Sequence, residues 1–381
     1  MKNIYMDYAA TTFINKEVLS DMLPFITGNF GNPSSMYSLS SINKIAIDKS
    51  RKKLADALNC NRKEIYFTGC GTEADNWAIK GCALANRKKG NHIITSCIEH
   101  HAVLHSCEYL EKNGFEITYL PVDKEGNVSL DKLKAEIKDS TILVSIMTAN
   151  NEIGTIEPIS SIGSICRERG ILFHTDAVQA AGHINLDVEK MKIDLLSLSG
   201  HKFYGPKGIG ALYIRKGTKI DSILHGGAQE RGKRAGTENI AGIVGIGTAL
   251  ALSIKELENE QLRLTKLRDY FVKKLLNIEG AFLNGPSSDN RLAGNVNVGF
   301  NGVDAELLLI MLDEKGICAS SGSACAAGAI DPSHVLLAIG LTKEAAKSSI
   351  RLTLGCETTK EKIDYVASLI NEMTSKLRNI L

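Results

Sequence analysis

The pattern of hydrophobic and polar positions between residues 64 and 214 alternates between two periods. Short apolar runs are each followed by a longer stretch with apolar residues three and four positions apart. The short runs predict strands at 64–68, 92–96, 116–121, 141–148, 171–175, 194–198 and 210–214. The longer stretches predict helices at 72–86, 101–112, 129–138 and 158–169. This alternation is typical of βαβ crossovers, so we expect an α/β domain whose mainly parallel sheet is covered by helices.

The pattern changes near Lys255. A long charged helix is predicted at 255–276, followed by shorter elements of both kinds. These are a turn at 284–286, strands at 295–300 and 349–354, helices at 305–315 and 332–339, and a small-residue loop at 319–328. Thr358 and Glu361 form a capping-box pattern that opens a C-terminal helix. We expect a large domain over residues 15–255 and a smaller α+β domain made of residues 1–14 and 256–381.

Composition and charge exclude several classes of protein. The 381 residues are 44% hydrophobic and 23% charged, as in an ordinary globular protein, and the net charge is only +2. No broad basic field is available for nucleic acid or for an anionic membrane. The longest apolar run, at 240–254, is interrupted by glycines and is shorter than the ~20 residues that span a bilayer, so it predicts a buried helix.

The nine cysteines are scattered and contain no C-x-x-C pair. No zinc-type spacing is present, so no metal site is predicted. The N-terminal residues lack the apolar core of a signal peptide, and we therefore expect a cytoplasmic protein with reduced thiols.

Lys202 and Asp176 are the strongest candidates for chemistry. Lys202 follows a predicted strand within Ser199-Gly200-His201-Lys202, and Asp176 ends another. Ligands of such sheets bind beyond the carboxyl ends of the strands. A lysine there is a candidate Schiff-base residue, and a carboxylate can pair with a pyridinium nitrogen, as pyridoxal phosphate requires. A solvated lysine and a helix N-cap are the simpler alternatives.

Other loops at the same predicted edge carry candidate ligands. Gly71 and Thr72 open a helix directly after a strand, where backbone N–H groups favour an anion such as phosphate. Ser199 and His201 would add phosphate contacts from the neighbouring loop. His100 follows a third strand, and its ring can stack on a flat cofactor or move protons. Each of these residues has an ordinary capping or loop role as its alternative.

Two further candidates come from the C-terminal part of the chain. Cys325 lies among glycine, serine and alanine, which is unlike the bulky surroundings of a core cysteine and favours a reactive thiol. Arg351 is a charge inside an apolar strand. It either faces solvent at a sheet edge or holds a carboxylate with two hydrogen bonds.

Together these residues resemble the pyridoxal-phosphate-dependent cysteine desulfurases of the NifS/IscS type, a branch of the class V aminotransferases. The likeness covers nearly the whole chain. The motifs that carry it are at 5–12, 31–35, 71–76, 99–104, 150–154, 176–179, 199–202, 229–232, 234–239 and 320–325. Any one of them is modestly specific, whereas all of them in this order are a strong signal.

The resemblance implies the aminotransferase-like fold type I, pyridoxal 5'-phosphate as cofactor, L-cysteine as substrate and a homodimer. It assigns Lys202 as the Schiff-base lysine and Cys325 as the thiol that takes up sulfur as a persulfide. On the cofactor ring, the resemblance assigns His100 to stacking, Asp176 to the ring nitrogen, and Asn151 and Gln179 to the phenolic oxygen. The cofactor phosphate would be bound by Gly71, Thr72, Ser199 and His201, and Thr237 would reach the phosphate of the partner subunit's cofactor. Arg351, with Asn32, would bind the substrate carboxylate. The persulfide would pass to an iron–sulfur scaffold protein or another acceptor, for cluster assembly or for tRNA or cofactor thiolation. The segment from Ser321 to about Asp331 is expected to be mobile.

Some readings stay open at this point. A selenocysteine lyase, or another β-lyase or aminotransferase, would share the fold, and a non-catalytic sulfur-relay scaffold is a third possibility. Three positions depart from the family pattern: Tyr37, Ala293-Gly294 and Cys356. Cys356 is either a second thiol near Arg351 or a small residue that fills space. Cys70 and Cys318 are interpreted as structural.

Overall fold

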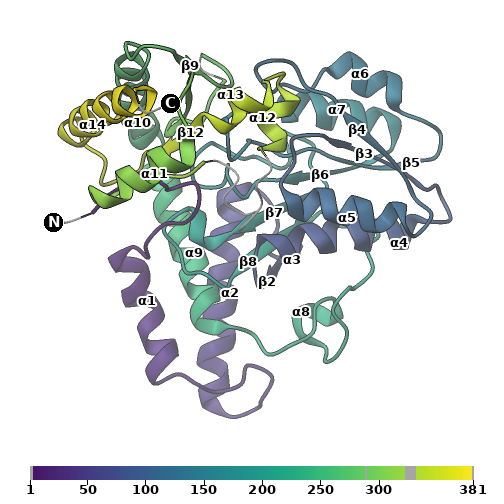
Figure 1. Cartoon of the computed structure of the whole chain (residues 1–381). Helices are drawn as coiled ribbons and strands as arrows, with labels where there is room; N and C mark the ends of the chain where they lie inside the picture. The colour runs from purple at the N-terminus through teal and green to yellow at the C-terminus, as the bar shows by residue number, and fades with distance from the viewer. Residues whose placement is uncertain (1–2, 288–289, 322–331, 380–381) are drawn as a thin grey trace.

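The structure is a computed structural model, and it describes residues 3–287, 290–321 and 332–379. Its largest element is a seven-stranded sheet with the strand order β2-β8-β7-β6-β5-β3-β4 (Figure 1). The strands are β2 (Ile65–Thr68), β8 (Gly210–Ile214), β7 (Leu195–Ser199), β6 (Leu172–Asp176), β5 (Thr141–Ser145), β3 (His92–Ser96) and β4 (Glu116–Leu120). β8 runs antiparallel to both of its neighbours and the other pairs are parallel. The expected α/β class with a mainly parallel sheet is confirmed.

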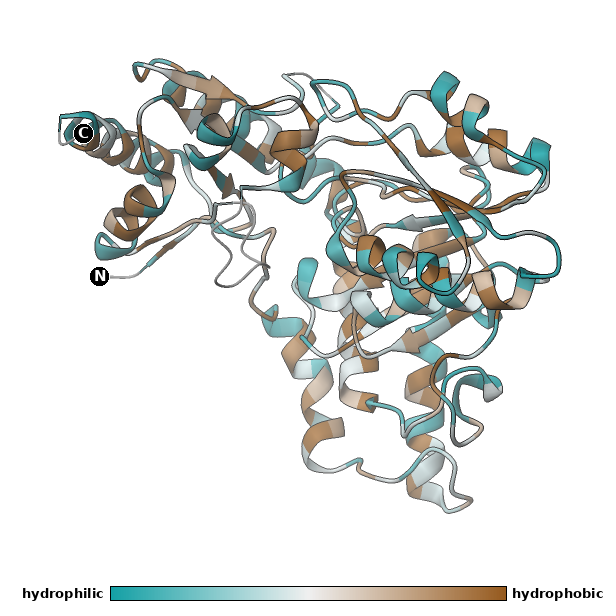
Figure 2. Cartoon of the chain, turned by 45° about the vertical axis from the view of Figure 1, so that its right-hand side comes forward, coloured by the Kyte–Doolittle hydropathy of each residue, from teal (hydrophilic) through white to brown (hydrophobic). Residues whose placement is uncertain are grey.

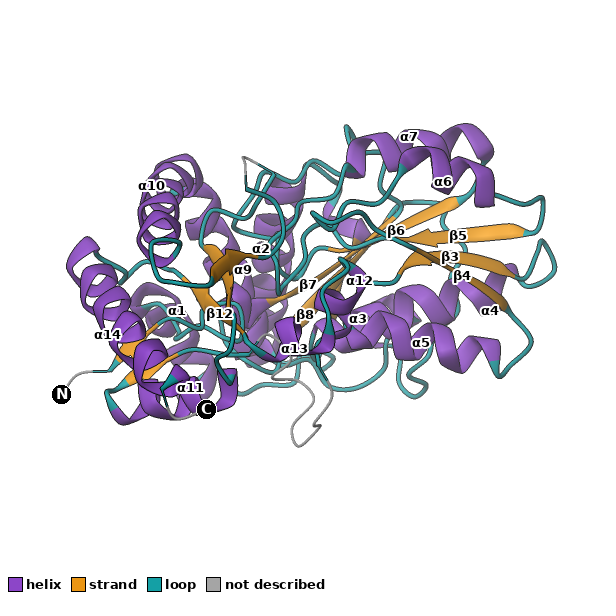
Figure 3. Cartoon of the chain, turned by 45° about the horizontal axis from the view of Figure 1, so that its top comes forward, coloured by secondary structure: helices purple, strands orange, loops and turns teal. Residues whose placement is uncertain are grey.

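Helices cover both faces of this sheet (Figure 3). Successive strand residues point to opposite faces, so Leu195 joins one apolar cluster and Leu196 the other. One face packs against α3 (Gly71–Asn76), a π-helical turn (Trp77–Gly81), α4 (Cys82–Asn86) and α5 (His101–Glu111). The opposite face packs against α6 (Leu130–Glu136), α7 (Ile159–Arg169), α2 (Ser38–Leu58) and α9 (Ile240–Lys255).

The C-terminal part of the chain builds a separate apolar cluster around a three-stranded antiparallel sheet, β12-β10-β9. Its elements are α10 (Leu257–Leu275), β9 (Ala281–Leu283), β10 (Asn295–Phe300), α11 (Ala305–Glu314), β12 (Ser349–Thr353) and α14 (Lys360–Arg378). The N-terminal strand β1 (Ile4–Tyr5) pairs with β11 (Ile317–Cys318), and Met6 is buried in the same cluster. The first residues of the chain therefore lie beside the last third of it.

Most predicted elements are present, with ends displaced by one to three residues. The cap of the C-terminal helix is different: the side chain of Thr359 accepts the N–H of Lys362, whereas Thr358 Oγ1 accepts the N–H of Gly355. Helix α1 (Lys16–Thr27) and helix α2 were not predicted. Their apolar residues do not mark one buried face, because Leu23, Ile26, Ile42 and Ile45 are exposed. Short helices α8 (Gln229–Gly232), α12 (His334–Ala338) and α13 (Lys343–Lys347) complete the fold.

Helix α9 is buried over most of its length, as its glycine-interrupted apolar pattern predicts. Within the described ranges, no helix by itself has the length and apolar character needed to cross a bilayer. Among the described helices, α9 and α10 pass that test only when taken together, and they meet at an angle of 70°.

Candidate active site

A cavity of about 400 Å³ opens where β6 and β7 end and α3 begins. It lies at the carboxyl ends of parallel strands, where α/β sheets bind ligands. Residues from distant parts of the sequence line it together. Those predicted as site residues are Gly71, Thr72, His100, Asn151, Asp176, Gln179, Ser199, His201, Lys202 and Arg351.

One end of the cavity is built for an anion. Gly71 and Thr72 open α3 directly after β2, and Ser199 lies at the end of β7. A Cβ atom on Gly71 would lie 2.7 Å from Cγ2 of Val178 and 3.3 Å from Cβ of Ser199, so only glycine fits without a shift. His201 Nδ1 lies 3.1 Å from Thr11 Oγ1, and burial lowers the pKa of His201 to about 4, which leaves its ring neutral.

Lys202 ends a short 3₁₀ helix (Gly200–Lys202) after β7. Its Nζ donates to the carbonyl oxygens of Ala9 at 2.7 Å and Ala10 at 2.8 Å. Gln179 Nε2 donates to the same Ala9 oxygen at 3.0 Å. The N-terminal segment thus forms the wall of the cavity that faces the lysine.

Asp176 lies at the end of β6 and is 5% exposed. One of its oxygens accepts the N–H of Val178 at 2.8 Å. Burial raises the pKa of Asp176 to about 6, although Lys202 opposes the shift. A buried carboxylate of this kind gains from a cationic partner, which a protonated pyridine nitrogen would provide.

Asp75 lies behind Asp176 and is also buried at the cavity wall. Burial, and then the charge of Asp176, raises the pKa of Asp75 well above its ordinary value. His174 Nε2 lies 3.6 Å from Asp75 Oδ1, but burial lowers the pKa of His174 to about 3. His174 is therefore a neutral imidazole, and it lies beside a carboxyl group whose protonated form is favoured by burial and by the charge of Asp176.

His100 caps α5, and its Nδ1 accepts the N–H of Ala102 at 3.1 Å. Burial, followed by the charge of Lys202, lowers the pKa of His100 to about 4. The ring is neutral near pH 7, and because Nδ1 accepts a hydrogen bond, its proton is on Nε2.

Arg351 extends from β12 into the cavity and is 3% exposed. Its Nη1 donates to the carbonyl oxygen of Asn151 at 3.0 Å, and its Nη2 donates to Asp7 Oδ1 at 2.8 Å. Among the described residues no acceptor faces its buried Nε. The guanidinium is thus held in place and retains N–H capacity for a carboxylate.

Three predicted site residues are not in this cavity as the structure describes it. Asn32 is exposed, and its side chain accepts the N–H of Ser34. Thr237 is exposed on the segment before α9. Cys325, with the segment expected to be mobile, lies outside the described residues except for Ser321.

Cys356 is exposed and lines a different cavity of about 460 Å³, beside Tyr204 and Arg263. Its N–H donates to the Tyr204 hydroxyl at 3.0 Å, and partial burial of the thiol raises its pKa. Cys70 does line the Lys202 cavity, although it was interpreted as structural.

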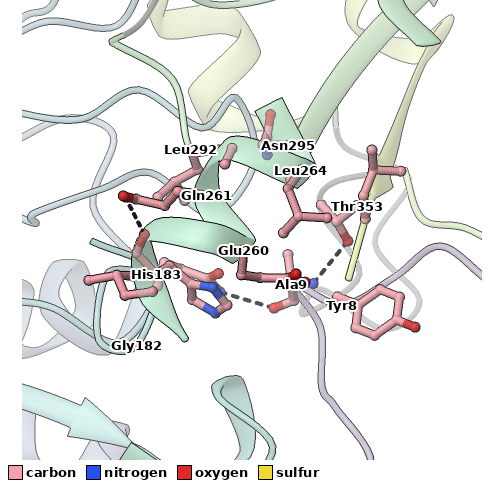
Figure 4. Close-up of a pocket in the computed structure, with 15 residues that line it drawn as sticks. Tyr8, Ala9, Gly182, His183, Glu260, Gln261, Leu264, Leu292, Asn295 and Thr353 are labelled. Atoms are coloured by element: carbon pink, nitrogen blue, oxygen red, sulfur yellow. Dashed lines mark hydrogen bonds between the residues drawn. The ribbon is translucent and has the colours of Figure 1, made fainter. Parts of the chain in front are cut away.

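A smaller hollow of about 60 Å³ shares Ala9 and Gln179 with the Lys202 cavity as lining residues. Figure 4 shows the residues that line it, among them Ala9, His183 and Leu264. Ala293 and Gly294, a departure from the family pattern, line it. A Cβ atom on Gly294 would lie 2.6 Å from the carbonyl oxygen of Leu354, which explains a glycine there.

Sequence reasoning missed Asp7, Asp75 and the carbonyl groups of Ala9 and Ala10. Asp7 and both alanines lie in the first motif, and Asp75 lies in the Gly71 motif, so their positions were noted without a role. A carboxylate four residues after Gly71 on a helix that opens at a ligand site is a signal that could have indicated Asp75.

Comparisons with known proteins agree with this geometry. The model of the class-V aminotransferase family matches residues 4–366. A cysteine desulfurase IscS from Methanosarcina thermophila is 59% identical over 379 residues, covering 100% of this chain and 94% of that protein. One from Clostridium botulinum strain Hall is 56% identical over 381 residues, covering 100% and 96%.

Solved structures agree as well. A NifS-like protein superposes with a TM-score of 0.93 and 38% identity, covering 98% of this chain and 100% of that one. A structure described as SspA in complex with cysteine has a TM-score of 0.83 and 39% identity, covering 92% and 98%. The fold and cavity are those of a pyridoxal-phosphate-dependent enzyme of fold type I. The chain belongs to the class-V aminotransferase family and, within it, to the cysteine desulfurases.

The residues present fit that cofactor. Gly71 lets α3 begin in close contact with Val178 and Ser199 at the cavity wall, where the N–H groups of a helix start favour a phosphate. Asp176 offers a buried carboxylate to the ring nitrogen. The predicted cofactor, enzyme class and fold type are confirmed.

Proposed function

We propose that the residues of the Lys202 cavity remove sulfur from L-cysteine, release L-alanine and pass the sulfur to Cys325. The observation that carries this proposal is the convergence on one cavity of Asp176 from the end of β6, Lys202 from the loop after β7 and Arg351 from within β12. Over one turnover, L-cysteine and the Cys325 thiol give L-alanine and a Cys325 persulfide. A carbon–sulfur bond is replaced by a sulfur–sulfur bond, with no external oxidant or reductant.

The cofactor, when bound, supplies an electron sink for the carbanion that forms at the substrate α-carbon. Lys202 would hold it covalently and, once displaced, would accept the α-proton. Asp176 would hold a proton on the ring nitrogen. Asn151 and Gln179 would contact the phenolic oxygen, although Gln179 must then leave Ala9.

Substrate binding is assigned to Arg351, whose guanidinium is already oriented by Asn151 and Asp7. Two parallel hydrogen bonds to a carboxylate would fix the α-carbon in the cavity. The neutral His100 ring would stack on the cofactor and relay protons through its Nε2, because its Nδ1 is engaged by Ala102. Asn32 would add a contact only if its loop moves toward the cavity.

A homodimer is part of the proposal. Helices α1 and α2 and the loop between them expose large apolar side chains, including Phe30 (79% exposed) and Met36 (101%). Figure 2 shows hydrophobic stretches along both helices. Several exposed large apolar side chains on neighbouring elements favour an interface. Thr237, exposed in one chain, would contact the phosphate of the partner subunit's cofactor. A single species at twice the chain mass in light scattering would support this arrangement.

We propose the two domains predicted from the sequence, with a boundary near Lys255. The apolar cluster that contains Phe271, Val298 and Ile370 is separate from those on the large sheet, which supports the division. A cytoplasmic location is also proposed; the free thiols of the described cysteines suit a reducing compartment.

The sulfur acceptor is proposed to be an iron–sulfur scaffold protein or another thiol-bearing acceptor, by analogy with the relatives named IscS. A selenocysteine lyase or aminotransferase would not require a persulfide on Cys325. A non-catalytic scaffold would not require the lysine, aspartate and arginine that meet in the cavity.

The test is a single turnover of the purified holoenzyme with L-cysteine and no reductant. About one alanine per subunit and one added sulfur on Cys325 by mass spectrometry are expected, and Cys325→Ala should abolish both. Alanine without sulfur on Cys325, or neither product despite a bound cofactor, would contradict the proposal.

A further inference from the structure

Lys202 is held by the peptide carbonyl oxygens of Ala9 and Ala10, and one side chain of the small sheet fixes that peptide segment. We propose that Thr353 is a positioning residue for the Schiff-base lysine. Its hydroxyl anchors Ala9, whose carbonyl receives the Lys202 amine when the substrate amine displaces it from the cofactor. The inference rests on the proposed role of Lys202.

The anchor is a single hydrogen bond. The N–H of Ala9 donates to Thr353 Oγ1 at 2.9 Å, a contact drawn in Figure 4. Thr353 is 4% exposed, and its own N–H donates to the carbonyl oxygen of Met6 at 2.7 Å. Thr353 therefore fixes the chain on both sides of Asp7, which pairs with Arg351 two residues earlier on β12.

The other side of the lysine loop is fixed independently. The N–H and the hydroxyl of Thr12 both donate to the carbonyl oxygen of His201 at 2.9 Å. His183 Nε2 lies 3.0 Å from the carbonyl oxygen of Lys202 itself. The lysine backbone is thus held at Thr12 and His183. The Ala9 carbonyl also accepts from Gln179 Nε2, and on the side of the small sheet Ala9 is anchored through Thr353.

The amine exchange explains why this position matters. One carbon–nitrogen double bond forms as another breaks; the substrate reacts as the free amine and Lys202 leaves as a neutral amine, so protons and electrons balance and the released lysine can accept the α-proton. The released amine keeps N–H donors that need acceptors near the cofactor, and the carbonyl oxygens of Ala9 and Ala10 supply them. Substrate amines should therefore bind more tightly when Ala9 is held in place.

The test compares two ligands of the holoenzyme. L-alanine displaces the lysine, whereas propionate has the same carboxylate and methyl group but no amine. Thr353→Val should weaken L-alanine about fivefold or more, measured from cofactor absorbance, because it removes the hydroxyl and keeps the shape of the side chain. Propionate, measured by competition, should bind as before.

Matched variants separate positioning from general damage. Thr353→Ser keeps the hydroxyl and should restore L-alanine binding, and Thr374→Val makes the same change at a buried threonine on α14 and should alter neither ligand. Thr353→Ala replaces the valine variant if that one does not fold. Unchanged L-alanine affinity, equal loss for both ligands, or failure of Thr353→Ser to rescue would each overturn the inference. Borohydride reduction fixes the cofactor to the lysine that holds it, and peptide mapping identifies that lysine. A lysine other than Lys202 would refute the proposed function, whereas the ligand affinities of the Thr353 variants test only the positioning role.

Discussion

Arg351 and Asp7 form an ion pair across 344 residues of sequence, with Nη2 of the arginine 2.8 Å from Oδ1 of the aspartate. The arginine side chain is almost fully buried and the aspartate side chain is 18% exposed. Asp7 therefore compensates the charge of the residue assigned to the substrate carboxylate. Two carboxylates, one internal and one from the substrate, would share a single guanidinium.

Asp7→Asn is expected to have opposite effects on substrate binding and on stability. Without the internal carboxylate, the site is more positive and should bind L-cysteine more tightly, so KM should fall by about threefold to tenfold, or roughly 1 kcal/mol. The free energy of unfolding should fall by about 1–2 kcal/mol, because a buried arginine loses its charged partner. Steady-state kinetics and thermal melts measure the two effects.

Arg351→Gln is the paired comparison for that prediction. Removing the cation should raise KM strongly, the reverse of the change in Asp7→Asn. A higher KM in both variants would mean that Asp7 serves to orient the arginine and does not compete with the substrate.

Gly71→Ala should weaken cofactor binding. Alanine stabilises a helix by ~1 kcal/mol relative to glycine, so the free energy of unfolding would rise if only helix propensity mattered. The added Cβ would instead meet Val178 Cγ2 at 2.7 Å, and the helix start must move away from the phosphate position. We expect the cofactor dissociation constant to rise at least about tenfold. Gly28→Ala is the control, because its added Cβ would lie 3.7 Å from the nearest atom, the carbonyl oxygen of Pro24. This variant should leave cofactor affinity unchanged.

Sequence alone predicted the residues that follow strands. Asp176 and Lys202 each come directly after an apolar run, and the rule that ligands bind at strand ends is enough to bring them together. Sequence alone identifies Arg351 as a charge within a strand, which either faces solvent at a sheet edge or binds a carboxylate. The choice between these two roles depends on which groups its side chain contacts. The structure supplies that information through Asp7 and the Asn151 carbonyl.

Contacts made by the N-terminal segment could not be predicted in this way. Ala9 and Ala10 contribute backbone oxygens, which no residue type reveals, and their distance from Lys202 depends on how β1 pairs with β11. Helices α1 and α2 escaped prediction because part of their apolar surface faces outward. Sequence periodicity detects a helix most readily when all of its apolar residues lie on one buried face.

Cys356→Ser should leave desulfuration nearly unchanged. Cys356 lies in the cavity beside Tyr204 and Arg263, whereas Lys202 and Arg351 line another one. We expect one sulfur on Cys325 in a single turnover of Cys356→Ser, as in the unmodified protein. Sulfur bound to Cys356 in the unmodified enzyme, or loss of transfer in the variant, would show that this thiol takes part in the relay.

The last prediction concerns Asp176, whose pKa is raised from 3.8 to about 6 by burial. Between these two values the folded chain holds a proton that the unfolded chain has released. This group therefore favours folding below about pH 4, and that contribution is lost as the pH rises through 6. At pH 8 the cofactor-free protein must keep a buried charge, and Asp176→Asn removes it.

In cofactor-free protein, Asp176→Asn should raise the melting temperature more at pH 8 than at pH 5, where the native carboxyl is mostly protonated. With cofactor bound, the same substitution should lower the melting temperature at pH 8, because the ring nitrogen loses its anionic partner. Differential scanning fluorimetry of both forms measures this reversal. The prediction is contradicted if Asp176→Asn raises the melting temperature equally at the two pH values, or raises it also with cofactor bound. Asp176 would then not pair with the ring nitrogen, and its burial would serve only the packing of β6.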